Sequence, residues 1–434
     1  MRELASVLAE AFMNGTWHVR SLMARGDLAL GTGGDWLREL AFAVVQYWRD
    51  APPEQSQLLV DFIATNEAFT RAWSEKTLPR HLRRYPLAHP AMGPRRWEVP
   101  SLGTVGDLAA WLELDASELG WLSDRRGLER VSAAEALRHY RRHWISRGAR
   151  LPRLLEAPKD RLKRVQRKIL DELLTRIPPH EAAHGFVPGR SVITHAELHA
   201  GQELVVRFDL EAFFTNVATW RALHVFRVAG YPEEVATFLL GLCTTRTPER
   251  VLREAPWVEE LPSERFFLQR RLAEWHLPQG APTSPALANL AAFTLDVRLE
   301  ALARKRELQY SRYADDLVFS GKRIAVGPLM QQVSSIARSE GFRLNVGKTR
   351  VMRAHEQQRV TGVVVNQKPN IAREEFDSLK ALLHRCAQRG PMSQSTGLAE
   401  FRARLQGKIA WVTQLSPARG AKLQQKFDSL DWSQ

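Results

Sequence analysis

Two adjacent aspartates, Asp315 and Asp316, stand directly before the apolar segment 317–319. On a straight strand, neighbouring side chains point to opposite faces, whereas at a tight hairpin turn both carboxylates can approach one site. Adjacent anions repel each other, and a divalent cation gives a physical reason to place them together. Because Asp-Asp pairs are also common in ordinary surface turns, the pair alone favours a metal site only weakly.

A third carboxylate, Asp209, ends the apolar segment 204–208. It could cap a loop, or it could be a metal ligand at the edge of a sheet. Nucleotidyl transfer uses two divalent ions about 3.5–4 Å apart, of which one lowers the pKa of the attacking hydroxyl and the other neutralises charge on the leaving pyrophosphate. Carboxylates from two neighbouring strands suit this reaction, provided that the fold brings positions 209 and 315 together.

A loop rich in proline follows at residues 277–285, which read Leu-Pro-Gln-Gly-Ala-Pro-Thr-Ser-Pro. We expect Ser284 to cap a helix that has Pro285 in its first turn. Backbone N–H groups at such a helix start suit a phosphate or a template backbone. A simple helix-initiating turn is the alternative, although the nine-residue string is more specific than a turn requires.

The charge of the chain indicates a polyanionic partner. Its 434 residues include 62 Lys and Arg against 48 Asp and Glu, a formal net charge of +14. A protein this basic usually meets a polyanion, and colloidal solubility is the alternative. Residues 138–168 hold 12 Lys and Arg against two acids, Glu156 and Asp160. A solvated helix face would mix the signs, so this run predicts phosphate contacts.

The elements that must position these residues form a mixed α+β pattern after residue 200. Apolar patterning predicts strands at residues 204–209, 317–319, 342–344 and 360–365. It predicts helices from Pro285 to about Leu302, around residues 329–336 with an end near Gly341, and in the basic tail 374–432.

The N-terminal 90 residues also place apolar side chains at helical spacing, and the Pro-rich stretch 86–100 predicts a linker. Two cysteines are too few for a disulfide framework or a zinc site, so we expect reduced thiols in the cytosol. The sequence has no run of about 18 apolar residues, and no membrane partner is expected.

These motifs together resemble those of bacterial reverse transcriptases, in the same order. The matching palm motifs are Phe-Asp-Leu-Glu-x-Phe-Phe at 208–214, the loop 277–285 and Tyr-Ala-Asp-Asp at 313–316. Further matches are the fingers motifs at 153–159 and 185–191 and the segment 341–349. The resemblance covers about residues 100–434. It implies a right-hand polymerase with an antiparallel palm sheet: a helical N-terminal extension (1–90), linker and fingers (91–200), palm with returning fingers segments (201–366) and a helical thumb (367–434).

Within that family the sequence is most similar to retron reverse transcriptases. Val-Thr-Gly at 360–362 matches the element with which retron enzymes bind their own noncoding RNA. Retrons also tend to carry Asn-Ala-x-x-His before the first catalytic strand. Here the segment 195–199 reads His-Ala-Glu-Leu-His, so the Ala and the final His199 fit while His195 replaces the Asn.

The resemblance implies a role for each catalytic carboxylate. Asp209 and Asp315 would bridge two Mg²⁺ ions, with Asp316 more peripheral and the Leu210 carbonyl as an additional metal ligand.

It also implies nucleotide contacts. Phe214 would stack under the sugar and exclude a ribose 2′-OH, although the same spacing would suit a core aromatic, the role expected of Phe213. Gln279 would lie at the nucleotide. Arg190 and Lys159 would contact the triphosphate, because a guanidinium fork pairs well with phosphate oxygens.

Four further positions complete the expected site. Lys348 could donate a proton to pyrophosphate or be a surface cation. Thr361 and Gly362, and with them His199, would contact RNA, and a plain β-turn is the alternative for the first two.

The sequence therefore predicts an RNA-directed DNA polymerase that copies a noncoding RNA, extends DNA from a 2′-OH of that RNA and serves in antiphage defence. Its expected partners are dNTPs, the noncoding RNA, the RNA–DNA duplex and an effector protein. Two alternatives remain: a defence-associated or intron-related reverse transcriptase with different priming, and an inactive polymerase fold that scaffolds RNA.

Overall fold

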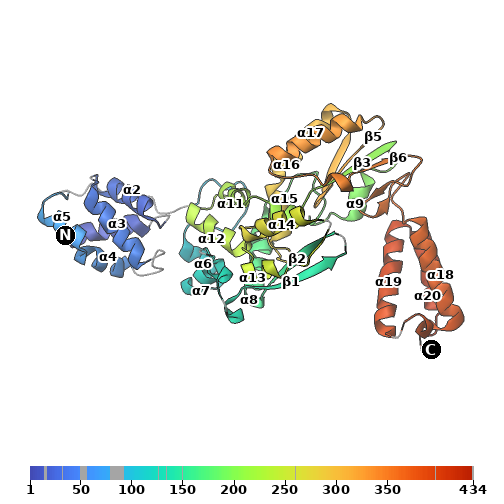
Figure 1. Cartoon of the computed structure of the whole chain (residues 1–434), viewed down its shortest axis with the longest axis horizontal. Helices are drawn as coiled ribbons and strands as arrows, with labels where there is room; N and C mark the ends of the chain where they lie inside the picture. The colour runs from blue at the N-terminus through green and yellow to red at the C-terminus, as the bar shows by residue number, and fades with distance from the viewer. Residues whose placement is uncertain are drawn as a thin grey trace. The chain divides into compact units, whose positions relative to one another are not determined.

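A computed structural model describes residues 1–13, 17–31, 33–48, 56–78, 92–125, 127–132, 134–148, 150–259, 261–395 and 397–432 (Figure 1). The chain divides into two compact units, each built from two stretches of sequence. The first unit is Met1–Pro178 with Val217–Leu287, and the second is Pro179–Asn216 with Ala288–Gln434. Most of the predicted linker 86–100 lies outside the described residues.

The N-terminal part of the first unit is a set of five helices around its own apolar core. The helices are α1 (Arg2–Met13), α2 (Val19–Leu30), α3 (Asp35–Tyr47), α4 (Ser56–Thr65) and α5 (Glu67–Ser74). Leu8, Phe12, Leu40 and Phe69 are fully buried in that core. The helical character predicted for this region is therefore confirmed over its described residues.

The rest of the first unit combines short helices with one β-hairpin. Its elements are α6 (Val105–Leu112), α7 (Ala116–Ser123), β1 (Tyr140–Arg147), β2 (Arg150–Pro158), α8 (Asp160–Lys168), α11 (Thr219–Val228), α12 (Glu233–Cys243), α13 (Glu249–Arg253) and α14 (Pro262–Ala273). The basic run of the sequence builds the antiparallel β1–β2 hairpin and α8.

The second unit is centred on a four-stranded antiparallel sheet with the order β4-β5-β3-β6. The strands are β3 (Leu204–Asp209), β4 (Gln309–Tyr313), β5 (Asp316–Gly321) and β6 (Arg350–Arg353). The strands predicted at 204–209 and 317–319 are confirmed. The strand predicted at 342–344 is wrong: Leu344 forms only an isolated bridge with Leu210, because the chain turns there into a 3₁₀ turn at Val346–Lys348.

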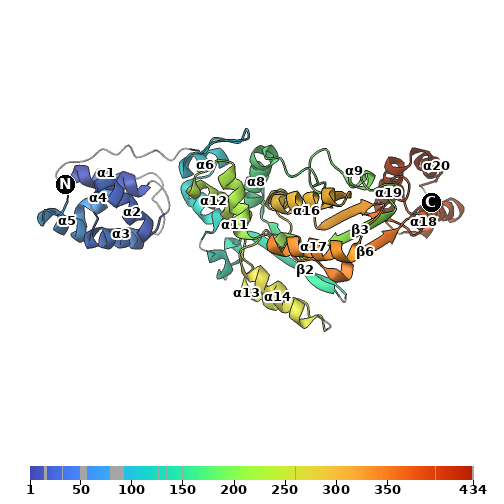
Figure 2. The same cartoon turned by 90° about the horizontal axis from the view of Figure 1, so that it is seen from above.

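The two faces of this sheet carry different side chains, because successive residues of a strand alternate. Phe208, Tyr310 and Phe319 share one face, and their rings are in contact. Helices α16 (Phe293–Lys305) and α17 (Val326–Ser339) run along the sheet, and α16 packs beside β4 (Figure 2). The predicted helix from Pro285 is in fact two helices, α15 (Ser284–Ala291) and α16, since Ala292 leaves helical geometry at φ −86° and ψ 4°.

The opposite face carries the acidic residues and joins a second core. Val205 and Val318 on this face belong to a cluster that also includes α9 (Val192–Glu197), the two-residue strands β7 (Arg359–Val360) and β8 (Val363–Val364), and the C-terminal helices. These helices are α18 (Arg373–Arg389), α19 (Leu398–Leu415) and α20 (Pro417–Asp428), as the tail pattern predicted.

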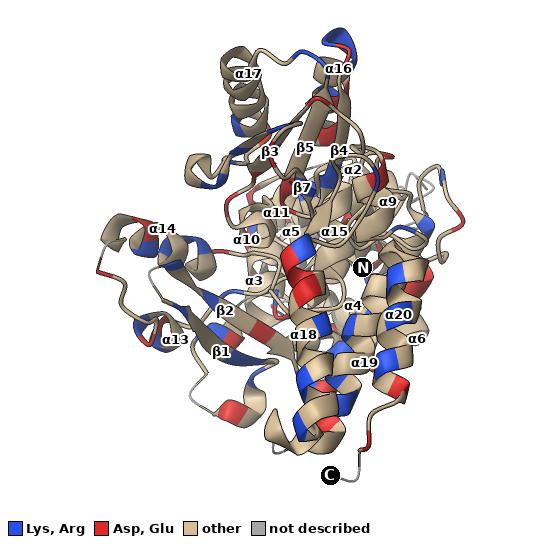
Figure 3. Cartoon of the chain, turned by 90° about the vertical axis from the view of Figure 1, so that its right-hand side faces the viewer, with Lys and Arg blue, Asp and Glu red and all other residues tan. Residues whose placement is uncertain are grey.

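Basic side chains are distributed along all three C-terminal helices (Figure 3). The exposed cations on them are Arg373, Lys380, Arg385, Arg389, Arg402, Arg404, Lys408, Lys422 and Lys426. Among the described helices, none has the length and apolar character needed to span a membrane.

Candidate active site

The fold brings the predicted carboxylates together. In the antiparallel pairing of β3 with β5, Asp209 lies directly opposite Asp316. Directly opposite residues share one face of a sheet, with Cβ atoms about 4.5–5.5 Å apart. The Leu210 N–H donates a hydrogen bond of 2.8 Å to the Asp315 carbonyl oxygen, which fixes the end of β3 against the hairpin turn. The condition set by the sequence, that positions 209 and 315 meet, is fulfilled.

A tight turn presents the two adjacent aspartates. Strand β4 ends at Tyr313, β5 begins at Asp316, and these two residues pair with each other. Only Ala314 and Asp315 lie between them, and Ala314 has φ +54°. Two-residue hairpin loops require such left-handed backbone, which a small side chain tolerates better than a large one.

The carboxylates repel one another, and two cations partly offset that repulsion. Burial raises the pKa of Asp316 to about 6; the charges of Asp315 and Asp209 add to the rise and Arg207 opposes it. The Arg207 Nε atom lies 3.5 Å from Asp316 Oδ1. Lys348 Nζ lies 2.9 Å from both carboxylate oxygens of Asp209. The Lys348 ammonium and the Arg207 guanidinium thus lie beside the carboxylates that would attract a divalent cation.

The donor set fits metal ions of the kind that bind together with a substrate. Within the described residues, no three His, Cys, Asp or Glu side chains converge closely enough to hold a metal by themselves. Mg²⁺ in polymerase sites is typically bound through one or two carboxylates together with substrate phosphates and water. Asp209 and Asp316 face each other, and Asp315 is adjacent, so the carboxylates that such a metal needs are present. Their mutual repulsion at Asp316 would be relieved by a cation.

A buried arginine, which sequence reasoning missed, holds the hairpin from the other face of the sheet. Arg312 is fully buried, and its Nε and Nη2 atoms donate to the Asp296 carboxylate at 2.8 and 2.6 Å. Its Nη1 atom donates to Asn289 Oδ1 at 2.9 Å and to the Ala314 carbonyl oxygen at 3.1 Å. One side chain thus ties α15 and α16 to the turn that carries the aspartates.

The paired phenylalanines after β3 have different environments. Phe213 is buried, with Phe342 at a ring distance of 5.7 Å and the Arg312 guanidinium 5.4 Å from its ring centre. Its predicted place in the core is confirmed. Phe214 is only partly buried and has Phe186 as a ring neighbour at 6.2 Å. A partly open ring five residues beyond Asp209 is compatible with the predicted contact to a sugar, which stays a prediction.

The other predicted nucleotide contacts are found in both units. Arg190, in the second unit, braces its own loop by donating to the Ala183 carbonyl oxygen at 2.8 Å and to that of Glu181. Lys159, in the first unit, donates to the Glu135 carbonyl oxygen at 2.6 Å. Gln279, also in the first unit, has a buried Oε1 atom without a hydrogen-bond partner in the described structure.

The predicted RNA contact at His199 is not compatible with its placement. His199 is fully buried, and its two ring nitrogens each lie 2.7 Å from a serine hydroxyl, Ser320 on β5 and Ser311 on β4. Burial lowers its pKa to about 3, so the ring is neutral and bridges strands β4 and β5 of the hairpin that carries the aspartates. The last histidine of the retron-like motif therefore positions the hairpin and leaves no surface for RNA.

The Val-Thr-Gly element forms a tight turn between β7 and β8. Thr361 has φ +47° and Gly362 has φ +88°, and space around Gly362 is open. Thr361 Oγ1 lies 3.4 Å from Nδ1 of His195, whose ring is 5.7 Å from that of Tyr313. A chain of contacts thus runs from this turn to the catalytic hairpin.

The basic run is only partly free for phosphate. Arg142 is buried between Glu129 and Glu156, with N–O distances of 2.8 and 2.9 Å. Arg161 pairs with Glu118 and Lys168 with Glu113. The expectation of phosphate contacts is therefore wrong for Arg142, because Glu129 from outside the run and Glu156 from within it neutralise it in the interior.

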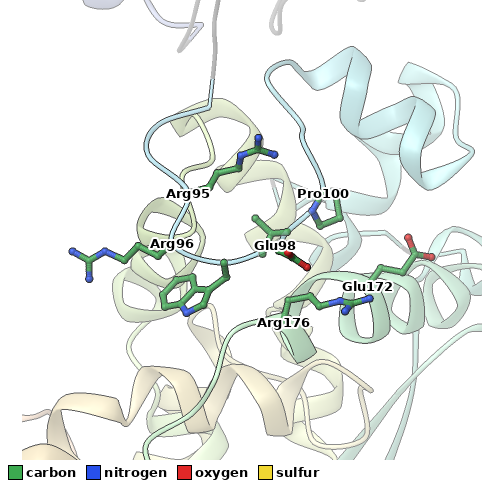
Figure 4. Close-up of a pocket in the computed structure, with 8 residues that line it drawn as sticks. Arg95, Arg96, Glu98, Pro100, Glu172 and Arg176 are labelled. Carbon is green, nitrogen blue, oxygen red and sulfur yellow. The ribbon is translucent and has the colours of Figure 1, made fainter.

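A separate hollow lies in the first unit, between the segment 95–100 and the helical turns at 172–176 (Figure 4). Its volume is about 650 Å³, and its charged side chains are Arg95, Arg96, Glu98, Glu172 and Arg176. The arginines Arg95 and Arg96 point in different directions. None of the predicted site residues lines this mixed-charge hollow.

Comparison with known proteins identifies the family. Residues 148–365 match the family described as reverse transcriptase (RNA-dependent DNA polymerase). The Retron Mx65 reverse transcriptase of Myxococcus xanthus is 37% identical over 339 residues, which cover 76% of this chain and 72% of the relative. The Retron Mx162 reverse transcriptase of the same organism is 32% identical over 408 residues, covering 83% and 81%. The Retron Ec86 reverse transcriptase of Escherichia coli is 29% identical over 253 residues, covering 57% and 70%.

These matches agree with the carboxylates that the antiparallel sheet brings together. The chain belongs to the bacterial retron-type reverse transcriptases and is an RNA-directed DNA polymerase.

Proposed function

We propose that this enzyme copies one noncoding RNA into DNA by two-metal nucleotidyl transfer at Asp209, Asp315 and Asp316. The observation that carries the proposal is the pairing of Asp209 with Asp316 across β3 and β5, beside a turn that also presents Asp315. Arg207 and Lys348 place positive charge beside this acidic cluster and offset part of its repulsion.

Each carboxylate has a distinct part in the proposal. Asp209 and Asp315 would hold the Mg²⁺ ions, Asp316 would be more peripheral, and the Leu210 carbonyl would be an additional ligand. The ions, when bound, lower the pKa of the attacking hydroxyl and stabilise the leaving pyrophosphate. Lys348, whose ammonium pairs with Asp209, would contact the pyrophosphate.

Nucleotide selection is assigned to four further side chains. Phe214 lies against the sugar and leaves no space for a ribose 2′-OH. Gln279 supplies an amide whose Oε1 atom has no partner in the described protein. Arg190 and Lys159 would hold the triphosphate, and each would exchange a backbone carbonyl partner for it.

We assign nucleic-acid binding to two surfaces, an exposed turn and a set of basic helices. The exposed turn at Thr361 and Gly362 contacts the noncoding RNA, and the cations of α18, α19 and α20 follow the RNA–DNA duplex as a thumb. Phosphate contacts of this kind position a nucleic acid without reading its sequence. The fingers, palm and thumb would correspond to residues 91–200, 201–366 and 367–434, preceded by the helical extension 1–90.

The biological setting is part of the same proposal. The enzyme would extend DNA from a 2′-OH of its own RNA in the cytoplasm, where dNTPs are available, and the product would act in antiphage defence with an effector protein.

Primer extension with wild type, Asp315→Ala and Asp316→Ala tests the chemistry, with Asp35→Ala on α3 as an exposed control. We expect loss of extension in the first two variants and wild-type extension in the control. Equal activity in all four proteins would overturn the assignment. Sequencing of the nucleic acid that copurifies tests the substrate, because a single structured RNA joined to DNA is expected.

A further inference from the structure

Phe186 is a large aromatic residue held in a backbone conformation that such residues avoid. Its φ is +60°, in the left-handed region, and 52% of its surface is exposed. For a bulky residue this region is a genuine outlier, and such strain persists where the surrounding structure imposes it, often at a ligand site. Because half of the ring is open to solvent, burial in a core does not explain the conformation.

The preceding residue shows what imposes the strain. A Cβ atom at Gly185 would lie 2.7 Å from the Ala314 backbone nitrogen, so the loop backbone touches the turn that carries the catalytic aspartates. The Gly185 carbonyl oxygen accepts a hydrogen bond of 2.8 Å from Asn289 Nδ2. Asn289 in turn accepts from the buried Arg312. The same network therefore fixes both the catalytic turn and the loop that presents Phe186.

The Phe186 ring completes a group of three aromatics beside the carboxylates. Its centre lies 6.2 Å from that of Phe214 and 6.3 Å from that of Tyr313, with interplanar angles of 52° and 43°. Phe214 follows Asp209 by five residues, and Tyr313 pairs with Asp316. The three rings thus border the place where the metals, the sugar and the base of a nucleotide would have to lie.

We infer that Phe186 stacks on the base of the incoming dNTP, an inference that rests on the proposed function. If Phe214 faces the sugar, its ring neighbour Phe186 is the aromatic within reach of the base. Every base offers a flat π face, so stacking on an aromatic tolerates all four bases. A phenyl ring has no hydrogen-bonding group, and it therefore supports the nucleotide without selecting among bases. The strained loop keeps the ring in place before the nucleotide arrives.

The experiment measures single-turnover addition of one dNTP to a saturating primer–template in Phe186→Ala, Phe186→Trp and Phe186→Gly. Phe293→Ala is the matched control, since Phe293 is also about half exposed and has His180 as its ring neighbour. Stacking contributes roughly 1–3 kcal/mol per base, so Phe186→Ala should raise the apparent Kd for dNTP about tenfold. The maximal rate and the Kd for primer–template should stay within twofold of wild type, and Phe186→Trp should restore dNTP affinity.

The glycine variant separates stacking from a structural role. Glycine adopts φ +60° without strain, so Phe186→Gly should keep or raise the Tm while its dNTP affinity falls as in the alanine variant. Unchanged dNTP affinity in Phe186→Ala would overturn the inference. A rise confined to the Kd for primer–template would also overturn it, in favour of a contact with the template. Failure of the wild-type enzyme to extend any primer would instead refute the proposed function.

Discussion

Replacing Asp316 by Asn is expected to stabilise the metal-free protein and to abolish polymerisation. Asp316 is mostly buried and lies opposite Asp209 and next to Asp315, and its pKa is raised from the ordinary 3.8 to about 6. A raised pKa means that the folded protein disfavours the ionised carboxylate more than the unfolded chain does. At neutral pH the ionised side chain therefore lowers stability, and an uncharged amide of similar shape removes that loss.

The magnitude follows from the pKa difference. Each pKa unit corresponds to about 1.4 kcal/mol, so ionised Asp316 destabilises the fold by up to about 3 kcal/mol. The effect is absent well below the unfolded pKa of 3.8, where the carboxyl is protonated in both states, and it grows as the pH rises to about 6. Asp316→Asn should therefore gain up to about 3 kcal/mol at pH 8 but only about half as much at pH 5.

Thermal unfolding in EDTA at both pH values measures this gain. For a unit of 150–250 residues, 1 kcal/mol shifts the Tm by about 2–4 °C, so a rise of up to about 10 °C is expected at pH 8. Asp377→Asn on α18 is the control, since its carboxylate is exposed and should change stability by less than about 0.5 kcal/mol at either pH. A gain for Asp316→Asn that is equal at pH 5 and pH 8, or no gain at all, would refute the reasoning.

Three further changes test the surroundings of the site. Phe214→Ala should raise the ratio of ribonucleotide to deoxyribonucleotide incorporation at least tenfold, as measured with single nucleotides, because the ring would no longer exclude the 2′-OH; an unchanged ratio would place Phe214 in a purely structural role. His199→Ala should lower the free energy of unfolding in urea by about 2–4 kcal/mol, because it leaves a cavity and unpairs Ser311 and Ser320; loss of RNA affinity at unchanged stability would contradict the buried, positioning role. Arg312→Met should lower the free energy of unfolding by about 3–5 kcal/mol, because it leaves Asp296 buried without its partner. Adding Asp296→Asn should recover part of this loss, whereas additive losses would show that the pair is not coupled.

The sequence was informative where the signal was local. Asp209 follows an apolar strand and Asp315 precedes one, so alternation and charge together predicted both strands and the acidic site. The same local reasoning failed at 342–344, where Phe342 is buried by contact with Phe213 rather than by strand pairing. An apolar segment reports burial, and burial has more than one structural cause.

Side chains whose partners are supplied by other elements of the fold could not be recognised in advance. Arg142 looked like one of many cations in a basic run, but Glu129 and Glu156 neutralise it in the interior. His199 matched a family motif that is associated with RNA, but the serines that bond it lie more than 100 residues away. In each case the type of residue predicted a ligand, while the fold supplied an internal partner.

The alternation of β4 explains how a cluster of repelling carboxylates can be held in one place. Tyr310 and Arg312 point to one face of the sheet and bond to Asp296, whereas Ser311 and Tyr313 point to the other face, toward His199 and His195. The strand that leads into the catalytic turn is thus fixed from both sides by buried groups. Electrostatic catalysis requires charged groups that keep their positions when the substrate binds. It is most effective when folding has already supplied the free energy that holds these groups in place. The buried hydrogen bonds that Arg312 and His199 make at β4 therefore stabilise the turn. This stabilisation opposes the repulsion between the carboxylates at Asp316.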